Sequence, residues 1–401
     1  MKQIYLWTGA LLTGAILGWL QIESINAVAN VVATIYTRLF QLLAVPTIVL
    51  AIITTMATFG TKSSGKLFGR TLVYTLLTTF AAAVVGAFLY VVIAPENLPV
   101  ETFLSDNSLE EPTGQSYADH LLSVVPNNIV KPFLEGNVLS LLLLAFAVGI
   151  GLSKLPDSEN KAVVVKGFLG LQELLFLLIR GLIWTLTLGI VAFSAQLSAQ
   201  LTAGVAAQSI GKYVLVVLGG NVIQFFIVLP LFLLARGLNP IRVFSSMMPA
   251  VLMALFTKSS AATLPVTMES AEKRLGVRGE VARFVLPICT TINMNGCAAF
   301  ILVTSLFVMQ HSPTLAITGN SLVFPSILLW LLISVFSAIG NAGVPMGCFF
   351  LTLSLMSGIG APIAVLGIIL PIYTIIDMIE TAENVWSDSC VCAMVDKDLK
   401  E

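Results

Sequence analysis

The chain has 401 residues, of which 57% belong to the hydrophobic set AVILMFWYC and only 10% are charged. Ordinary globular chains carry about 25% charged residues, so these few charges could not cover a water-facing surface of this size. The composition excludes a soluble globular protein and indicates a polytopic membrane protein. Twenty basic against 21 acidic residues leave a net charge of −1, so no binding to nucleic acid is expected.

Long apolar runs predict six helical spans in the first part of the chain, because a membrane crossing needs about 20 apolar residues. The start, a short Met-Lys-Gln followed by an apolar run, lacks the small-residue cleavage site of a secretory signal. It is therefore expected to form the first span. We place the spans at residues 4–22, 27–57, 68–94, 119–153, 163–193 and 208–235.

The distribution of Lys and Arg predicts the orientation, because basic loops stay in the cytoplasm. The loop after the second span carries Lys62, Lys66 and Arg70 and is placed inside. Residues 71–130 carry six acidic residues and no Lys or Arg, so this stretch is placed outside. The basic C-terminal tail agrees with this scheme. We expect a multi-pass protein of a bacterial inner membrane with both termini in the cytoplasm.

Three apolar segments of the second half contain polar or Gly/Pro-rich interruptions, at 257–260, 293–296 and 340–345. The first and third segments are expected to form re-entrant hairpins that enter from opposite sides, at 240–270 and 322–358. Non-helical backbone at membrane depth is tolerated where it is buried in protein or lines a cavity. Paired hairpins of opposite orientation are typical of inverted-repeat transporters. This pattern favours a secondary transporter.

The last predicted span, 362–395, is unusually polar. At about 100° per residue, one stripe within about 100° of arc holds Asp377, Glu380, Thr381, Asn384 and Asp388. A buried acid costs about 2.5–3.5 kcal/mol on insertion scales, so a functional role is expected. The alternative is a packing device in which the acids pair with Lys258 or with helix amides.

The two aspartates of this stripe, Asp377 and Asp388, lie about 16 Å apart along a helix. This distance suits two stacked sites. One could hold an ammonium group and the other a hard cation that takes oxygen ligands. Asn293, directly before a helix break, would add an amide oxygen. The residues alone thus predict a symporter for a substrate and a cation.

The five cysteines lie in apolar segments of the last third, without a CxxC pair or a histidine cluster. They are expected to be small buried hydrophobic side chains, so neither a disulfide framework nor a zinc site is predicted. They are Cys289, Cys297, Cys348, Cys390 and Cys392.

With these motifs the chain resembles the glutamate transporter family, also called the dicarboxylate/amino acid:cation symporters, over most of its length. The strong matches are to the serine-rich first hairpin tip, the NMDGTA break, the second hairpin tip and the substrate site of the last helix. They lie at 257–267, 291–298, 340–345 and 377–388, with weaker matches at 38–46, 74–79 and 125–128.

The resemblance implies an all-α membrane protein with eight transmembrane helices, two oppositely oriented re-entrant hairpins and inverted repeats. It also implies a homotrimer and an elevator mechanism. Scaffold helices would lie in 1–66 and 119–207. The transport domain would comprise 67–94 and 208–401, and 95–118 would form an extracellular loop.

For the substrate, the resemblance implies that Asp377 binds the ammonium group. Asn384 and backbone amides near Ser260 would hold the carboxylate, with help from Thr381. The full set of expected substrate-binding residues is Ser259, Ser260, Cys297, Val344, Asp377, Glu380, Thr381 and Asn384.

For the coupling ions, the resemblance implies three sodium sites and no organic cofactor. The first would use Asn293, Asn384 and Asp388 with backbone oxygens around Cys289. The second would use backbone oxygens near Thr291 and at Ala338, Ile339 and Asn341. A third would use Thr78, Thr79, Asn293 and Asn295.

One departure from the family concerns the substrate. Members that carry acidic substrates have Arg where this chain has Glu380, and such an Arg pairs with the substrate's side-chain carboxylate. Like charges about 4 Å apart repel by about 4 kcal/mol at an effective dielectric of about 20. Acidic amino acids and dicarboxylates are therefore not expected. Either Glu380 accepts a cationic or hydrogen-bond-donating side chain, or Lys258 neutralises Glu380 and the pocket takes small neutral amino acids.

The other departures are Asn295 for an Asp and Cys297 for a Thr of the family motif. The amide oxygen is neutral, so the third sodium site should be weak or absent. Glu380 and Glu383 are candidate proton carriers, because desolvation favours the protonated carboxyl. A symporter for acidic substrates and a channel of the same fold are the alternatives. An enzyme is not expected, since the chain has no Ser–His pair, close Asp dyad or HExxH motif.

Overall fold

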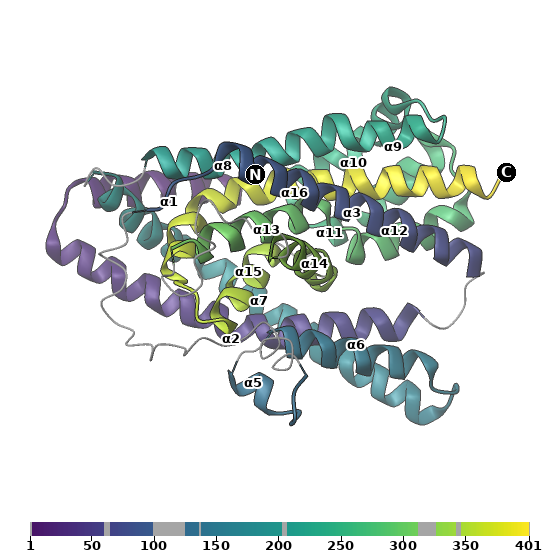
Figure 1. Cartoon of the computed structure of the whole chain (residues 1–401), viewed down its shortest axis with the longest axis horizontal. Coiled ribbons are helices and arrows are strands. Elements are labelled where there is room, and N and C mark those ends of the chain that lie inside the picture. Colours follow the sequence, from purple (N-terminus) through teal and green to yellow (C-terminus); the bar gives the residue numbers. More distant parts are fainter. Residues whose placement is uncertain are drawn as a thin grey trace.

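The structure is a computed structural model that describes residues 2–59, 65–98, 125–135, 138–202, 207–311, 326–341 and 346–400. These residues are mostly helical, and none of them forms a strand. Figure 1 shows the helices and their connections. The predicted all-α class is confirmed.

The first half of the chain forms helices close to most of the predicted spans. Within the predicted span 119–153, residues 125–130 are not helical. They are α1 Lys2–Trp19, α2 Glu23–Phe59, α3 Gly65–Ile93, α5 Lys131–Glu135, α6 Val138–Lys154, α7 Glu159–Thr202 and α8 Ala207–Ile223. The prediction of 163–193 for α7 was too short. Its polar C-terminal turns pack against α1, where Ser198 donates a hydrogen bond to the carbonyl of Ala15 (2.6 Å).

The second half consists of shorter helices and one long helix at the end. A π-helical segment, η2 Gln224–Val228, joins α8 to α9 Leu229–Ala235 and was not predicted. The remaining elements are α10 Pro240–Thr257, α11 Ser260–Ser270, η3 Ala271–Leu275, α12 Gly279–Ile292, α13 Asn295–Met309, α14 Ser326–Ala338, η4 Ile339–Asn341, α15 Gly347–Gly358 and α16 Ala364–Asp398.

The first two predicted interruptions are present. Lys258 has a left-handed backbone (φ 55°) after α10, and Ser259 caps α11 by accepting a hydrogen bond from the amide of Ala262 (3.2 Å). Asn293 and Met294 are non-helical between α12 and α13. At the third interruption, residues 342–345 lie outside the described residues, and α15 begins at Gly347.

Five helical segments among the described residues are long and apolar enough to cross a membrane. They are Lys66–Ile93, Gln208–Ala235, Pro240–Thr257, Gly279–Met309 and Ala364–Asp398. Several apolar helices of this kind support a multi-pass membrane protein. The count of eight crossings and the re-entrant nature of α10 and α11 stay predictions.

The helices pack in two groups that contact each other through α2, α6 and α7. One group contains α1, α2, α6 and α7, and the other contains α3 and the elements from α8 to α16. Contacts of α2 with α15 and of α7 with α16 join them. In Figure 1, α16 (yellow) runs beside α10 and α12, with which it packs. Because α13 and most of α16 are buried, their polar side chains lie inside protein.

Candidate functional site

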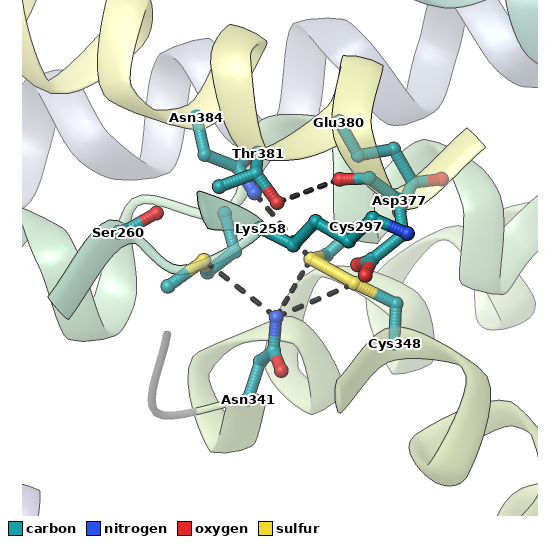
Figure 2. A pocket seen from close by; sticks show the side chains of 10 residues that line it. Lys258, Ser260, Cys297, Asn341, Cys348, Asp377, Glu380, Thr381 and Asn384 are labelled. Atoms are coloured by element: carbon teal, nitrogen blue, oxygen red, sulfur yellow. Dashed lines mark hydrogen bonds between the residues drawn. A yellow bond between two sulfur atoms is a disulfide. The ribbon is translucent and has the colours of Figure 1, made fainter. Parts of the chain in front are cut away.

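A small pocket lies where three helix interruptions meet α16 (Figure 2). The space between its side chains admits about one water molecule. The residues that line it are Lys258, Ser260, Met294, Cys297, Asn341, Cys348, Asp377, Glu380, Thr381 and Asn384. Most expected substrate-binding residues are thus brought together. Ser259 instead caps α11, and Val344 lies outside the described residues.

The lining residues of α16 recur at helical spacing. The four lining residues of this helix lie three, one and three positions apart, so a continuous helix turns them toward one side. They are Asp377, Glu380, Thr381 and Asn384. Thr381 donates a hydrogen bond to the backbone carbonyl of Asp377 (2.6 Å). The predicted polar stripe therefore forms one wall of the pocket, and all four residues are buried.

Two buried carboxylates face the pocket and share one hydroxyl group. Tyr373 Oη lies 3.3 Å from Asp377 Oδ1 and 3.3 Å from Glu380 Oε2. A hydroxyl carries one proton and can donate to only one of them at a time. The amide of Met346 donates to Asp377 Oδ2 (3.3 Å), whereas Glu380 Oε1 is buried without a hydrogen-bond partner among the described residues.

The positive charge of the pocket belongs to Lys258. Its side chain extends across the pocket in Figure 2, and Nζ donates a hydrogen bond to the carbonyl of Thr374. Lys258 also interacts electrostatically with Asp377. Its predicted pairing with Glu380 stays a prediction.

Two sulfur atoms in the pocket contradict the expectation for the cysteines. A disulfide joins Cys297 of α13 to Cys348 of α15, 51 residues apart in sequence. The amide nitrogen of Asn341 lies 2.8 Å from the sulfur of Cys297 and 3.3 Å from that of Cys348. The expectation of no disulfide was wrong here, because the chain folds back and brings α15 against α13. Cys289, Cys390 and Cys392 are free and buried, as expected.

A buried polar network lies beside the pocket, between α3, the α12–α13 break and α16. Thr78 donates to Asn293 Oδ1 (3.0 Å). Asn293 Nδ2 in turn donates to Asp388 Oδ1 (2.9 Å). The amide of Gly296 donates to Asn384 Oδ1 (3.0 Å), which links this network to the pocket wall. The structure thus brings together residues predicted for the first and third sodium sites.

In the same network, both the oxygen and the nitrogen of the Asn295 side-chain amide form hydrogen bonds. Thr79 donates to Asn295 Oδ1 (2.9 Å), and Asn295 Nδ2 donates to Ser387 Oγ (2.8 Å). Asn295 is fully buried. Its amide oxygen and one of its N–H groups are therefore satisfied by neutral side chains.

The chain resembles known proteins over nearly its whole length. A model of the sodium:dicarboxylate symporter family matches residues 4–398. The chain belongs to the sodium:dicarboxylate symporter family. Members of this family are transporters rather than enzymes, which agrees with the expectation from the motifs.

The relatives of this symporter include transporters of two named kinds. The neutral amino acid transporter B(0) of Oryctolagus cuniculus is 28% identical over 389 residues, with 88% of this chain and 70% of that protein covered. Excitatory amino acid transporter 2 of Rattus norvegicus is 28% identical over 410 residues, with the same coverage. An excitatory amino acid transporter of Caenorhabditis elegans is 26% identical over 404 residues, with 89% and 79% covered.

The other residues expected to bind ions in this symporter lie near α12 and η4, which pack together. The carbonyl of Cys289 accepts a hydrogen bond from the amide of Asn293 (2.8 Å). Thr291 donates to the carbonyl of Ile288 (2.8 Å). Ala338, Ile339 and Asn341 are buried at the end of α14 and in η4. Their roles as sodium ligands stay predictions.

Several side chains of the site were not predicted from the sequence. Tyr373 and Ser387 could have been found, because they lie four residues before Asp377 and three after Asn384, on the same helical stripe. No pattern in the sequence indicated that Met294 and Cys348 would line the pocket. Glu383 lies outside the pocket lining, and both of its carboxylate oxygens are buried without hydrogen-bond partners among the described residues.

Proposed function

We propose that this symporter couples the transport of a neutral or cationic amino acid to sodium ions, protons or both. The observation that supports this is the charge of the pocket. Two carboxylates, Asp377 and Glu380, face one ammonium group, that of Lys258, so the formal charges leave one negative charge. The ammonium and carboxylate groups of an amino acid cancel, whereas an acidic side chain brings a second negative charge.

Repulsion from Glu380 acts on the substrate's side chain. Two like charges about 4 Å apart repel by about 4 kcal/mol at an effective dielectric of about 20, which is roughly a thousandfold in affinity. Glu380 Oε1, which has no hydrogen-bond partner among the described residues, offers an acceptor instead. A side chain that donates a hydrogen bond or carries a positive charge would satisfy it. If Lys258 neutralises Glu380, the pocket suits a small neutral side chain.

The polar contacts of Asp377 suit the ammonium group of the substrate. Its carboxylate is buried, and among the described residues it has a long contact from the Met346 amide, a shared one from Tyr373 and the charge of Lys258 around it. Substrate binding would replace Lys258 by the ammonium group of the amino acid. Asn384, Thr381 and the start of α11 at Ser260 would hold the carboxylate, because helix N-termini attract anions.

We propose two sodium sites and no strong third one. Asn293, Asn384 and Asp388 would form the first, and the carbonyls near Thr291 and in η4 the second. The amide of Asn295 donates to Ser387, so a hydrogen bond between neutral groups stands where a charged ligand would attract a cation. Fewer sodium ions would then move in each cycle.

Protons would supply the remaining coupling through Glu383 and Glu380, and the repulsion of acidic substrates belongs to the ionised form of Glu380. A buried carboxyl group without a donor or a counter-ion is most stable in its neutral, protonated form. Glu383 fits this description at both oxygens among the described residues. Loss of pH dependence in Glu383→Gln, with uptake retained, would support this role, and an unchanged pH profile would contradict it.

The two helix groups suggest how the protein moves. We propose that α1, α2, α6 and α7 form a fixed scaffold and that the group around α16 slides along it as an elevator. The second hairpin, with α14 and α15, would act as the outer gate. The pocket as it stands admits about one water molecule, so this gate would have to open before an amino acid enters. A homotrimer in a bacterial inner membrane completes the proposal.

Thermal stabilisation of the purified protein tests the proposed function. A ligand that binds only the native state raises the melting temperature by mass action. Alanine, serine, lysine, arginine, glutamate and aspartate would be compared in sodium and in potassium chloride, at two pH values. We expect the largest shift from a neutral or cationic amino acid and a larger shift in sodium. The largest shift from glutamate or aspartate would contradict the proposal.

Glu380→Gln is the matched variant for this experiment, because it removes the charge and keeps the size. It should strengthen the binding of glutamate by about tenfold or more, since the repulsion is lost. Glu383→Gln, on the same helix but outside the pocket lining, should leave glutamate binding unchanged. Equal effects of the two variants would contradict a specific role of Glu380.

A further inference from the structure

Three buried side chains that can bind metal ions meet in the pocket. One ligand atom each of Cys297, Cys348 and Glu380 lies within 4.8 Å of the others. The three residues are 1%, 2% and 1% exposed. They come from α13, α15 and α16, so an ion held by all three would connect three separate helices (Figure 2).

The donor set and the size of the space point to one class of ligand. Two thiolates and a carboxylate suit zinc and related soft or borderline divalent cations, whereas sodium and other hard cations prefer oxygen ligands only. The space between the lining side chains admits about one water molecule. A single ion fits such a space without movement of the helices, and an organic molecule does not.

Asn341 supplies a further polar group at the two sulfurs. Its amide nitrogen lies 2.8 Å from the sulfur of Cys297, and its Oδ1 is buried without a hydrogen-bond partner among the described residues. Rotation of the amide by half a turn would exchange the two ends and turn the oxygen toward the sulfurs. The oxygen could then serve as a fourth ligand, which matches the preference of zinc for four.

We propose that Cys297, Cys348 and Glu380 bind one zinc-type divalent cation when the Cys297–Cys348 disulfide is reduced. A phosphine reductant gives two electrons to the S–S bond and is itself oxidised to the phosphine oxide, with oxygen from water. Two thiols result, and the cation displaces their protons when it binds the thiolates. The oxidised pair has no thiolate and does not form the site.

The metal would connect α15 to α13 and α16 and occupy the place of the substrate, so it should inhibit transport. This inhibition rests on the proposed function, but the binding of the metal does not. Metal binding without any amino acid transport would therefore sustain this proposal while the proposed function failed. Transport of an amino acid without metal binding would support the proposed function and overturn this proposal.

Cadmium ions provide the test, because cadmium bound to thiolates absorbs in the ultraviolet. The protein would carry serine at the three free cysteines, Cys289, Cys390 and Cys392, so that only the pocket pair can respond. After reduction with a phosphine, we expect one cadmium ion per chain and the thiolate absorption band. After oxidation of the same sample, we expect the band to disappear, and a second reduction should restore it.

Two variants test the ligands individually. Cys348→Ser and Glu380→Gln should each weaken cadmium binding at least tenfold, and Glu383→Gln should leave it unchanged. The comparison of oxidised and reduced protein needs no mutation of the pair and remains decisive where a variant does not fold. The absence of a band in the reduced protein, a band that survives oxidation, or equal effects of Glu380→Gln and Glu383→Gln would overturn the proposal.

Discussion

At the scale of single residues, the amide of Asn295 gives a prediction about ion coupling. It accepts from Thr79 and donates to Ser387, so an aspartate there would lose the donor and place a buried charge beside Ser387. We predict that Asn295→Asp loses about 1–3 kcal/mol of stability in potassium chloride, the cost of an unsatisfied buried polar group. Sodium should restore much of it by binding the new carboxylate. Thermal denaturation in the two salts measures this.

The wild-type protein is the control for Asn295→Asp. Its own sodium dependence comes from the other sites and should be smaller than that of the variant. Equal responses of variant and wild type to sodium would show that the amide does not replace a charged ligand.

Only some residues of the candidate site could be predicted from the sequence. The stripe of α16 could be predicted because helical periodicity alone brings Asp377, Glu380 and Asn384 to one face. The contacts of Thr78 and Thr79 with the α12–α13 break were expected only from the family resemblance. The pairing of Cys297 with Cys348 could not be predicted, because it depends on how a hairpin folds back over 51 residues.

At the scale of helices, α1 and α7 approach closely through two glycines. A Cβ atom at Gly14 would lie 2.3 Å from the carbonyl oxygen of Val191, and one at Gly18 would lie 2.1 Å from that of Ala195. Small residues four positions apart are typical of close helix pairs in membranes. We predict that Gly14→Ala or Gly18→Ala lowers stability by about 1–3 kcal/mol, because backbone atoms must move.

Gly9 on the same helix is the matched control, since a Cβ there would meet no atom within 4 Å. Gly9→Ala should be neutral or slightly stabilising, because alanine favours the helix. Thermal denaturation in detergent compares the three variants. A loss at Gly9 as large as that at Gly14 would contradict the packing argument.

The end of α16 is fixed to two other helices by one carboxylate. Asp398, whose side chain is 0% exposed, forms ion pairs with Arg70 of α3 and with Arg236 at the end of α9. Tyr74 also donates to Asp398 (2.7 Å). We predict that Asp398→Asn lowers stability by about 2 kcal/mol, less than the roughly 3–5 kcal/mol for fully buried pairs, because both guanidinium groups keep part of their hydration.

The exposed ion pair of Glu269 and Lys273 offers a control for this substitution. The side chain of Glu269 is 62% exposed and that of Lys273 is 73% exposed, so Glu269→Gln should change stability by less than about 1 kcal/mol. Chemical or thermal denaturation would measure both variants under the same conditions. Similar losses in the two would mean that the Asp398 cluster holds the helices no more firmly than a surface pair.

Some helix boundaries could be predicted from the local sequence, and others could not. The breaks at 257–260 and 293–296 could be predicted, because polar residues interrupt apolar runs there. The length of α7 and the π-helical segment η2 could not, because packing against α1 and against α3 and α16 fixes them.

At the scale of the whole molecule, much apolar surface remains exposed on one chain. On α7, Trp184 is 82% exposed and Leu188 is 66% exposed. Such side chains face lipid or neighbouring chains in a membrane. We predict a trimer in mild detergent, with a protein mass of three chains in light scattering corrected for detergent. A mass of one chain would contradict the trimer.

The proposed pocket rejects acidic amino acids because Glu380 faces the substrate. Competition for uptake into proteoliposomes tests it most directly. The labelled substrate would be the amino acid that stabilises the protein most, with unlabelled alanine, serine, lysine, arginine and glutamate as competitors. We expect competition by neutral or cationic amino acids, with glutamate weaker by about a hundredfold or more. Glutamate that competes as strongly as the best of them would contradict it.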